Sequence, residues 1–216
     1  MEGSQLTLLL LHGTGGNESD LIQLGHELAP RAALLSPRGK VLENGMPRFF
    51  RRLGEGIFDL NDLADQTHNL AVFIREASKA YGFPLGRVVA VGYSNGANIA
   101  GSTLILHPET LAGAALFRPM VPFVPDAMPQ LSRKPILILA GLQDRIVPKE
   151  ETERLAGLLR RAGAEVTLRW ADAMHGIASE EVAAARDWLA ERFPAESARE
   201  LKYSGILYTT RWTRLQ

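Results

Sequence analysis

Six short apolar segments, separated by helical patterns, set the strongest limit on how this chain can fold. Each is rich in Leu, Val or Ile and ends near a glycine or proline. They cover residues 6–11, 32–36, 87–92, 111–117, 135–140 and 165–170. Continuous rather than alternating hydrophobicity is typical of strands covered on both faces, as in parallel sheets. We therefore expect an α/β fold with a mostly parallel, doubly wound sheet of about six to seven strands.

Helical periodicity fills most of the stretches between the apolar segments. It is found over residues 62–81, 149–162, 179–192 and, in a shorter form, 19–28. In the first of these, Leu63, Leu70 and Ile74 fall on one face of the predicted helix. A chain of 216 residues can bury about 70% of the surface that it exposes when unfolded, which suits a single domain.

Two segments break this alternation. Residues 39–59 mix aromatics, arginines and glycines without a sustained period, which predicts a long loop over one end of the sheet. Residues 194–216 follow the last predicted helix, so we expect a domain of residues 1–193 and a C-terminal tail. The tail could lack fixed structure, add a strand through 205–210, or pack on a partner chain.

The composition excludes several classes of protein. Lys and Arg number 24 against 24 Asp and Glu, so the broad basic face that nucleic acid or an anionic membrane attracts is not expected. The absence of cysteine excludes disulfides, thiolate metal sites and a cysteine nucleophile. No signal sequence and no membrane span is visible, so a cytoplasmic protein without membrane insertion is expected.

The strongest local motif is the pentapeptide GYSNG at residues 92–96, between an apolar strand and a helical segment. A nucleophile on a sharp strand-to-helix turn needs small residues two positions before and after it, and Gly92 and Gly96 satisfy this requirement. Ser94 is thus the candidate nucleophile, and the backbone amide of Asn95 could stabilise an oxyanion. The alternative is that Ser94 only caps the helix.

A serine nucleophile needs a base, and the chain contains five histidines. His175 lies on a loop between the last predicted strand and the last predicted helix, so it can reach the same sheet edge as Ser94. Asp144 follows another strand and would orient the imidazole, giving the chain order Ser, Asp, His. Asp172, three residues before His175, is the competing carboxylate.

The glycine-rich sequence HGTGG at residues 12–16 follows the first predicted strand. A second oxyanion donor is expected from this position, and the backbone amide of Thr14 is our choice, with Gly13 or Gly15 as alternatives. Binding of a nucleotide phosphate is the weaker interpretation, because the Walker lysine and the full dinucleotide-binding spacing are both missing.

These motifs together resemble the α/β-hydrolase superfamily and, within it, the bacterial phospholipase/carboxylesterase family. The segments that carry the resemblance are LHGTGGNESDL, GMPRFFRR with EGIFDL, VGYSNGANIA, FRPMVPF, AGLQDRIVP and AMHG, from about residue 6 to residue 193. The resemblance implies a serine hydrolase with the triad Ser94, Asp144 and His175 and an oxyanion hole of the Thr14 and Asn95 amides. It implies no metal and no organic cofactor. A dienelactone hydrolase is disfavoured, because the elbow residue is Ser rather than Cys.

The expected activity is that of a carboxylesterase acting on small-molecule esters with a short-chain acyl or aryl group. An acyltransferase, a perhydrolase, or a lysophospholipase or acyl-protein thioesterase would use the same acyl-enzyme, and a non-enzymatic binding protein is a further alternative.

No insertion is long enough for a cap domain, so loops should roof the pocket. Candidate pocket residues are Phe49, Arg118, Met120, Ile146 and Met174, although ordinary packing is an equal alternative for the apolar ones. Arg48 and Arg118 could bind an anionic substrate group or form structural ion pairs. Association of two chains into a homodimer is a further possibility that the sequence leaves open.

Overall fold

The computed structural model describes residues 6–131, 133–194 and 206–209, and within them seven strands form one parallel sheet. The order of the strands is β10-β9-β8-β7-β1-β2-β11, and every neighbouring pair is parallel. The strands are β1 (Thr7–Leu11), β2 (Ala33–Pro37), β7 (Val88–Tyr93), β8 (Gly113–Phe117), β9 (Pro135–Gly141), β10 (Glu165–Ala171) and β11 (Ile206–Thr209). This arrangement confirms the predicted α/β class and the parallel sheet.

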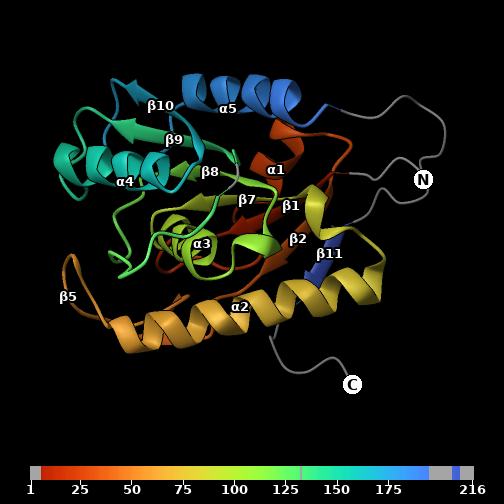
Figure 1. Ribbon diagram of the computed structural model, residues 1–216, viewed down its shortest axis with the longest axis horizontal. Helices are drawn as coiled ribbons and strands as arrows, with labels where there is room; N and C mark the ends of the chain where they lie inside the picture. Colours follow the sequence, from red (N-terminus) through yellow and green to blue (C-terminus); the bar gives the residue numbers. More distant parts are fainter. Residues whose placement is uncertain (1–5, 132, 195–205, 210–216) are drawn as a thin grey trace.

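Helices cover both faces of the sheet (Figure 1). They are α1 (Ile22–Leu28), α2 (Leu60–Tyr81), α3 (Asn95–Leu106), α4 (Lys149–Arg161) and α5 (Ser179–Arg192). The apolar residues of α2, α3 and α4 pack into one core, and those of α1 and α5 pack into a second core on the opposite face. The helix predicted over residues 19–28 is shorter than expected, because turns precede Ile22.

Strand β1 shows why the apolar segments are continuous. Leu9 and Leu11 belong to the core under α2, α3 and α4, whereas Leu8 and Leu10 belong to the core under α1 and α5. Successive side chains of a strand point to opposite faces, so a strand with helices on both sides needs apolar residues at every position.

The segment 39–59 is more regular than the predicted loop. It forms two antiparallel hairpins, one from β3 (Val41–Glu43) and β4 (Met46–Arg48), the other from β5 (Arg52–Gly54) and β6 (Ile57–Phe58). Asn44 and Gly45 have φ angles of 51° and 80° and make the two-residue turn of the first hairpin. An Asn-Gly pair is a strong sequence signal for such a turn. The prediction of a loop over residues 39–59 was therefore wrong, and Asn44-Gly45 is the signal that indicates a hairpin instead.

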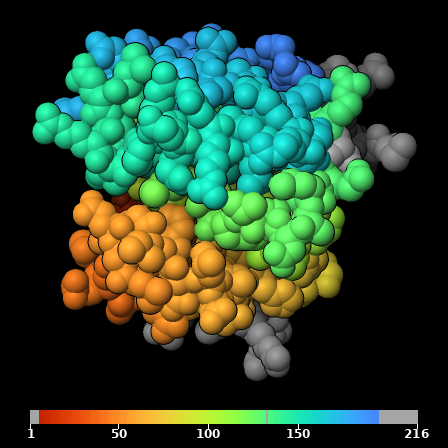
Figure 2. Space-filling model, turned by 60° about the vertical axis from the view of Figure 1, so that its left-hand side comes forward, coloured from red at the N-terminus to blue at the C-terminus, as the bar shows by residue number. Residues whose placement is uncertain are grey.

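The two hairpins lie over one end of the sheet, as predicted for this segment: the amide of Gly15, which follows β1, donates to the carbonyl of Pro47 in β4, and Gly56 lies beside Met120, which follows β8. Figure 2 shows the side of the molecule where the orange segment that contains them faces the teal segment around residue 150, with a hollow between the two. In the C-terminal tail, β11 extends the sheet by pairing with β2, in register from Ile206 opposite Leu34. The rest of the predicted tail, residues 195–205 and 210–216, lies outside the described residues.

Candidate active site

The turn at Ser94 places the candidate nucleophile between β7 and α3. Ser94 has a φ of 52°, a left-handed value that residues other than glycine rarely adopt. Both flanking glycines are required by close packing. A Cβ on Gly92 would lie 2.6 Å from the carbonyl oxygen of Gly96, and a Cβ on Gly96 would lie 1.9 Å from that of Leu11. The turn is therefore held tightly against the end of β1.

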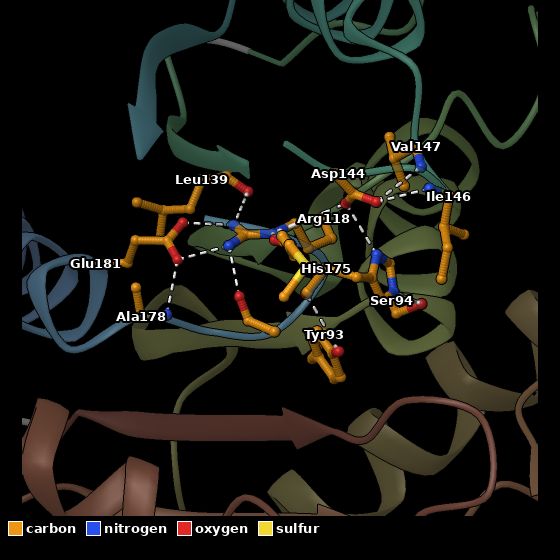
Figure 3. A network of polar contacts seen from close by, with 12 residues as sticks. Tyr93, Ser94, Arg118, Leu139, Asp144, Ile146, Val147, His175, Ala178 and Glu181 are labelled. Carbon is orange, nitrogen blue, oxygen red and sulfur yellow. Dashed lines mark hydrogen bonds and ion pairs between the residues drawn. The ribbon is translucent and has the colours of Figure 1, made fainter. Parts of the chain in front are cut away.

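Three side chains from separate strand ends form a continuous hydrogen-bonded chain (Figure 3). The Nε2 atom of His175 lies 3.0 Å from Oγ of Ser94, and its Nδ1 atom lies 2.8 Å from Oδ2 of Asp144. The other carboxylate oxygen of Asp144 accepts hydrogen bonds from the amides of Ile146 and Val147. Asp144 is 1% exposed at its side chain, so its orientation is fixed by these contacts.

The competing carboxylate lies elsewhere. Asp172 is exposed, and its Oδ1 accepts a hydrogen bond of 2.6 Å from Nε2 of Gln143. The structure thus brings Asp144, rather than Asp172, to the imidazole of His175.

Residues 12–17, here called the glycine loop, run beside the nucleophile turn. The amide of Gly15 already donates to the carbonyl of Pro47 at 2.9 Å, which removes Gly15 as an alternative oxyanion donor. Within the described residues, no backbone carbonyl accepts from the amides of Thr14 or Gly13. Asn95 is the first residue of α3, where backbone amides have no acceptor within the helix. The amides of Thr14 and Asn95 therefore have no backbone acceptor among the described residues, and both stay the predicted oxyanion donors.

His12, the first residue of the glycine loop, is buried and ties the loop to the segment after β2. It is 1% exposed, and burial lowers its pKa, so the neutral ring is favoured. Its Nε2 atom accepts from the amide of Gly39 at 3.0 Å, so the proton lies on Nδ1, which donates to the carbonyl of Gly13 at 2.7 Å. The ring also packs on Phe49, with 4.7 Å between the ring centroids.

Arg48 is not the substrate-facing cation considered from the sequence. It is 3% exposed, and burial lowers its pKa, although Glu43 opposes that effect at an ion-pair distance of 3.2 Å. Its Nη1 atom donates to the hydroxyl of Thr14 at 2.7 Å, and its Nε atom donates to the carbonyl of Phe50. The guanidinium thus links the first hairpin to the glycine loop.

Two predicted pocket residues are in the interior. Phe49 is 1% exposed and packs in the larger core, and Arg118 is 1% exposed with its guanidinium bonded to protein atoms. Neither side chain is open to a substrate in this structure, which argues against the predicted pocket-lining role of both. Ile146 and Met174 are 49% and 68% exposed, and Met120 is partly buried, so these three side chains remain open to contact from outside.

A cavity of about 470 Å³ opens beside the glycine loop. Its lining residues include Gly13, Thr14, Gly16, Asp20, Tyr93 and Ile177. The sequence did not single out Tyr93, Ile177 or Asp20, although Tyr93 and Ile177 each lie within two residues of a predicted triad member. That closeness was the signal that could have identified them.

Two kinds of feature are missing from the residues that the structure describes. No group of three or more His, Cys, Asp or Glu side chains there could hold a metal ion. None of the helices there combines the length and the apolar character that crossing a membrane requires.

Comparison with known proteins gives matches over most of the chain. A model of the Dienelactone hydrolase family matches residues 60–202. The Bacillus subtilis protein MhqD, described as a hydrolase, is 50% identical over 188 residues, which cover 87% of this chain and 94% of MhqD. The match to this family holds although the elbow residue of the chain is Ser rather than Cys.

Solved structures of bacterial carboxylesterases have the same fold. The Bacillus cereus carboxylesterase superposes with a TM-score of 0.86 at 47% identity, covering 89% of this chain and 92% of that one. The Mesorhizobium loti carboxylesterase gives a TM-score of 0.83 at 36% identity, covering 87% and 89%. These matches confirm the predicted α/β-hydrolase fold.

Proposed function

Because the chain belongs to the Dienelactone hydrolase family, within the α/β-hydrolase superfamily, we propose that it is a serine carboxylesterase acting on small carboxylic esters. The observation that carries the proposal is the chain of hydrogen bonds from Ser94 through both nitrogens of His175 to Asp144. This arrangement can remove the hydroxyl proton during attack on a carbonyl. The similarity to the carboxylesterases of B. cereus and M. loti supports an ester as the substrate.

The proposed reaction has two halves. In the first, Nε2 of His175 takes the proton of Ser94 as Oγ attacks the ester carbonyl, and the imidazolium then protonates the leaving alkoxide, leaving an acyl group on Ser94. In the second, His175 takes a proton from water as the water oxygen attacks the acyl-enzyme carbonyl, and the imidazolium then returns a proton to Oγ of Ser94 as the carboxylic acid leaves. Asp144 holds the imidazole in the tautomer that both halves need.

The oxyanion of each tetrahedral intermediate would be held by the amides of Thr14 and Asn95. One such donor is typically worth about 3 to 4 kcal/mol of transition-state stabilisation. Asn95 benefits in addition from its place at the N-terminus of α3, where the helix dipole favours negative charge.

Exposed apolar side chains suggest where the two parts of an ester could lie. Ile146 and Met174 flank the triad members Asp144 and His175 in the sequence, and both are exposed. The cavity beside the glycine loop, which Tyr93 and Ile177 also line, offers room for a small acyl, alkyl or aryl group. We propose esters with short-chain acyl or aryl groups. A cytoplasmic location and a homodimer stay predictions, to be checked by cell fractionation and by the mass of the protein in solution.

The test is a hydrolysis screen over acyl length and leaving group with the full chain and Ser94→Ala. We expect the variant to lose at least about 10⁴-fold in kcat, because the covalent step has no nucleophile. Ser179→Ala, at an exposed serine that begins α5, is the matched control and should keep full activity. A fluorophosphonate should label the wild type and not Ser94→Ala. Full hydrolytic activity in purified Ser94→Ala would overturn the proposal.

A further inference from the structure

The loop that carries His175 (residues 172–178, the histidine loop) is held by side chains at three consecutive carbonyls. Arg118 donates from Nε to the carbonyl of Met174 at 3.0 Å and from Nη2 to that of Gly176 at 2.6 Å. Between them, the hydroxyl of Tyr93 donates to the carbonyl of His175 at 3.2 Å. In the described part of the chain, no backbone amide donates to these three carbonyls. Arg118 and Tyr93 therefore bind the loop at and beside His175 (Figure 3), and the amide of Gln143 binds it at the carbonyl of Ala173.

Arg118 reaches the histidine loop from the interior of the sheet. It follows β8 directly, its side chain is 0% exposed, and its φ is 57°, a left-handed value unfavourable for an arginine. Its amide and its Nη1 atom both donate to the carbonyl of Leu139 in β9, at 2.9 and 3.3 Å. The backbone and the guanidinium of Arg118 are thus both bonded to β9, and the same guanidinium contacts the histidine loop.

Glu181 orients the guanidinium. Its two carboxylate oxygens accept from Nη1 and Nη2 of Arg118, the second at 2.7 Å, and Glu181 is 3% exposed. Oε2 of Glu181 also accepts from the amide of Ala178 at 2.9 Å, at the start of α5. The same carboxylate therefore holds Arg118 and ends the histidine loop.

The charges of this buried group complement the proposed reaction. Nε of Arg118 lies 3.8 Å from Oδ2 of Asp144, so one cation stands between two buried carboxylates, and the three groups sum to one negative charge. When His175 takes up the proton of Ser94, the set including His175 becomes neutral. Buried charges are tolerated when they are compensated in this way.

We propose that Arg118, oriented by Glu181, is a positioning residue for ester hydrolysis: it fixes the histidine loop so that His175 stays aligned with both Ser94 and Asp144. This inference rests on the proposed function. It replaces the expectation that Arg118 binds an anionic substrate. It also gives Glu181 a second role, orienting Arg118, besides accepting from the amide of Ala178 at the start of α5. A misplacement of a reacting group by about 1 Å can lower a rate by about 100-fold, so a loosened loop should be visible in kcat.

The decisive variant is the double replacement Arg118→Met with Glu181→Met. Arg118→Met alone would leave the buried carboxylate of Glu181 without its partner and can prevent folding, whereas removal of both charges leaves an apolar pair. We expect kcat for a p-nitrophenyl ester to fall by about 10- to 100-fold, with KM changed by less than about 2-fold. Arg118→Lys should give an intermediate kcat, because a single ammonium cannot reach both loop carbonyls and the carboxylate.

Hydrogen exchange of the full chain tests the same loop without relying on activity. Amides of residues 172–178 should exchange faster in the double variant than in the wild type, while those of the glycine loop should not change. Thr67→Val is the control, because it removes a buried hydroxyl contact with Ser102, away from the histidine loop, and should lower stability without lowering kcat of the folded protein.

The outcomes separate the two proposals. Unchanged exchange of the histidine loop, or a kcat of the folded double variant within about 2-fold of wild type, would overturn the positioning role. A fall in activity that only follows the fraction of unfolded protein, as for Thr67→Val, would also overturn it. Absence of ester hydrolysis in the wild type would instead overturn the proposed function, and the exchange measurement would still decide whether Arg118 holds the loop.

Discussion

Two loops meet at Ser94, and they are fixed by different means. The histidine loop is held from inside the sheet, by the buried guanidinium of Arg118 and the hydroxyl of Tyr93. The glycine loop is held from outside, by the first hairpin: Pro47 accepts from the amide of Gly15, and Arg48 donates to the hydroxyl of Thr14. Proton transfer would therefore depend on the guanidinium of Arg118, which follows β8 of the sheet, and oxyanion binding on Pro47 and Arg48 of the first hairpin.

Substitutions near the two loops should therefore affect different steps of catalysis. A change near Arg118 should disturb the alignment of an acid-base group, which acts in both halves of the proposed reaction. A change near the first hairpin should loosen one of two oxyanion donors and leave the triad in place. Substitutions on the two sides should accordingly differ in size, and the predictions below run from the largest effect to the smallest.

The largest effect on the histidine side is expected from Asp144→Asn. An amide at this position favours the wrong tautomer of His175, which in a comparable triad lowers kcat by about 10⁴-fold. Asp172→Asn is the matched control, because Asp172 contacts Gln143 rather than the imidazole, and it should stay within about 2-fold of wild type. Equal losses in the two variants would mean that Asp144 does not orient His175.

A smaller effect is expected on the glycine side from Thr14→Ala. The backbone amide remains, but Nη1 of Arg48 loses the hydroxyl that ties it to the loop, so kcat should fall by about 10-fold with little change in KM. Thr14→Ser retains the hydroxyl and should keep most of the activity. If the two variants behave alike, Arg48 does not position the loop, and steady-state kinetics on one short-chain ester suffices to decide.

The smallest effect concerns pH and His12. Burial lowers the pKa of His12, whereas a histidine in the unfolded chain titrates near about 6.5. The unfolded state thus binds the proton more readily than the folded state does. The free energy of unfolding therefore falls as the pH drops below about 6.5, by at most about 1.4 kcal/mol per pH unit. Between pH 7.5 and 5.5 the melting temperature of wild type should fall more than that of His12→Gln.

The control for this measurement is His26→Gln, at an exposed histidine in α1. Its melting temperature should follow that of wild type across the same range. If His12→Gln also follows wild type, the neutral state of His12 contributes nothing to the fold. The quantity to compare is the difference between the melting curve of each variant and that of wild type at each pH.

Local features of the chain could be predicted well from the sequence. The nucleophile turn depends on glycines two residues away from Ser94, and the parallel sheet depends on apolar residues at consecutive positions of each strand. The choice of Asp144 over Asp172 followed from the order of strand ends along the chain, and the structure brings that pair together. In each case the information lies within a few residues or in the order of elements.

The misplaced residues depend on contacts that are distant in the sequence. Arg118 looks like a substrate-binding cation until its partner Glu181, 63 residues later, is known. Phe49 looks like a pocket residue until the ring of His12 is found against it. Burial of an arginine or an aromatic residue is decided by the tertiary partner, which composition and periodicity do not reveal.

The outer position of β11 bears on how the protein behaves in concentrated solution. All five residues of strand β2 are buried, and all but Ser36 are apolar; β11 pairs with the side of β2 that faces away from β1, from Leu34 to Pro37. Without that pairing, β2 would be an edge strand with unbonded amides and carbonyls, a template on which another polypeptide can add a strand. Pairing with Ile206–Thr209 covers this side of β2. We therefore expect versions of the chain shortened before Ile206 to self-associate more readily as their concentration rises.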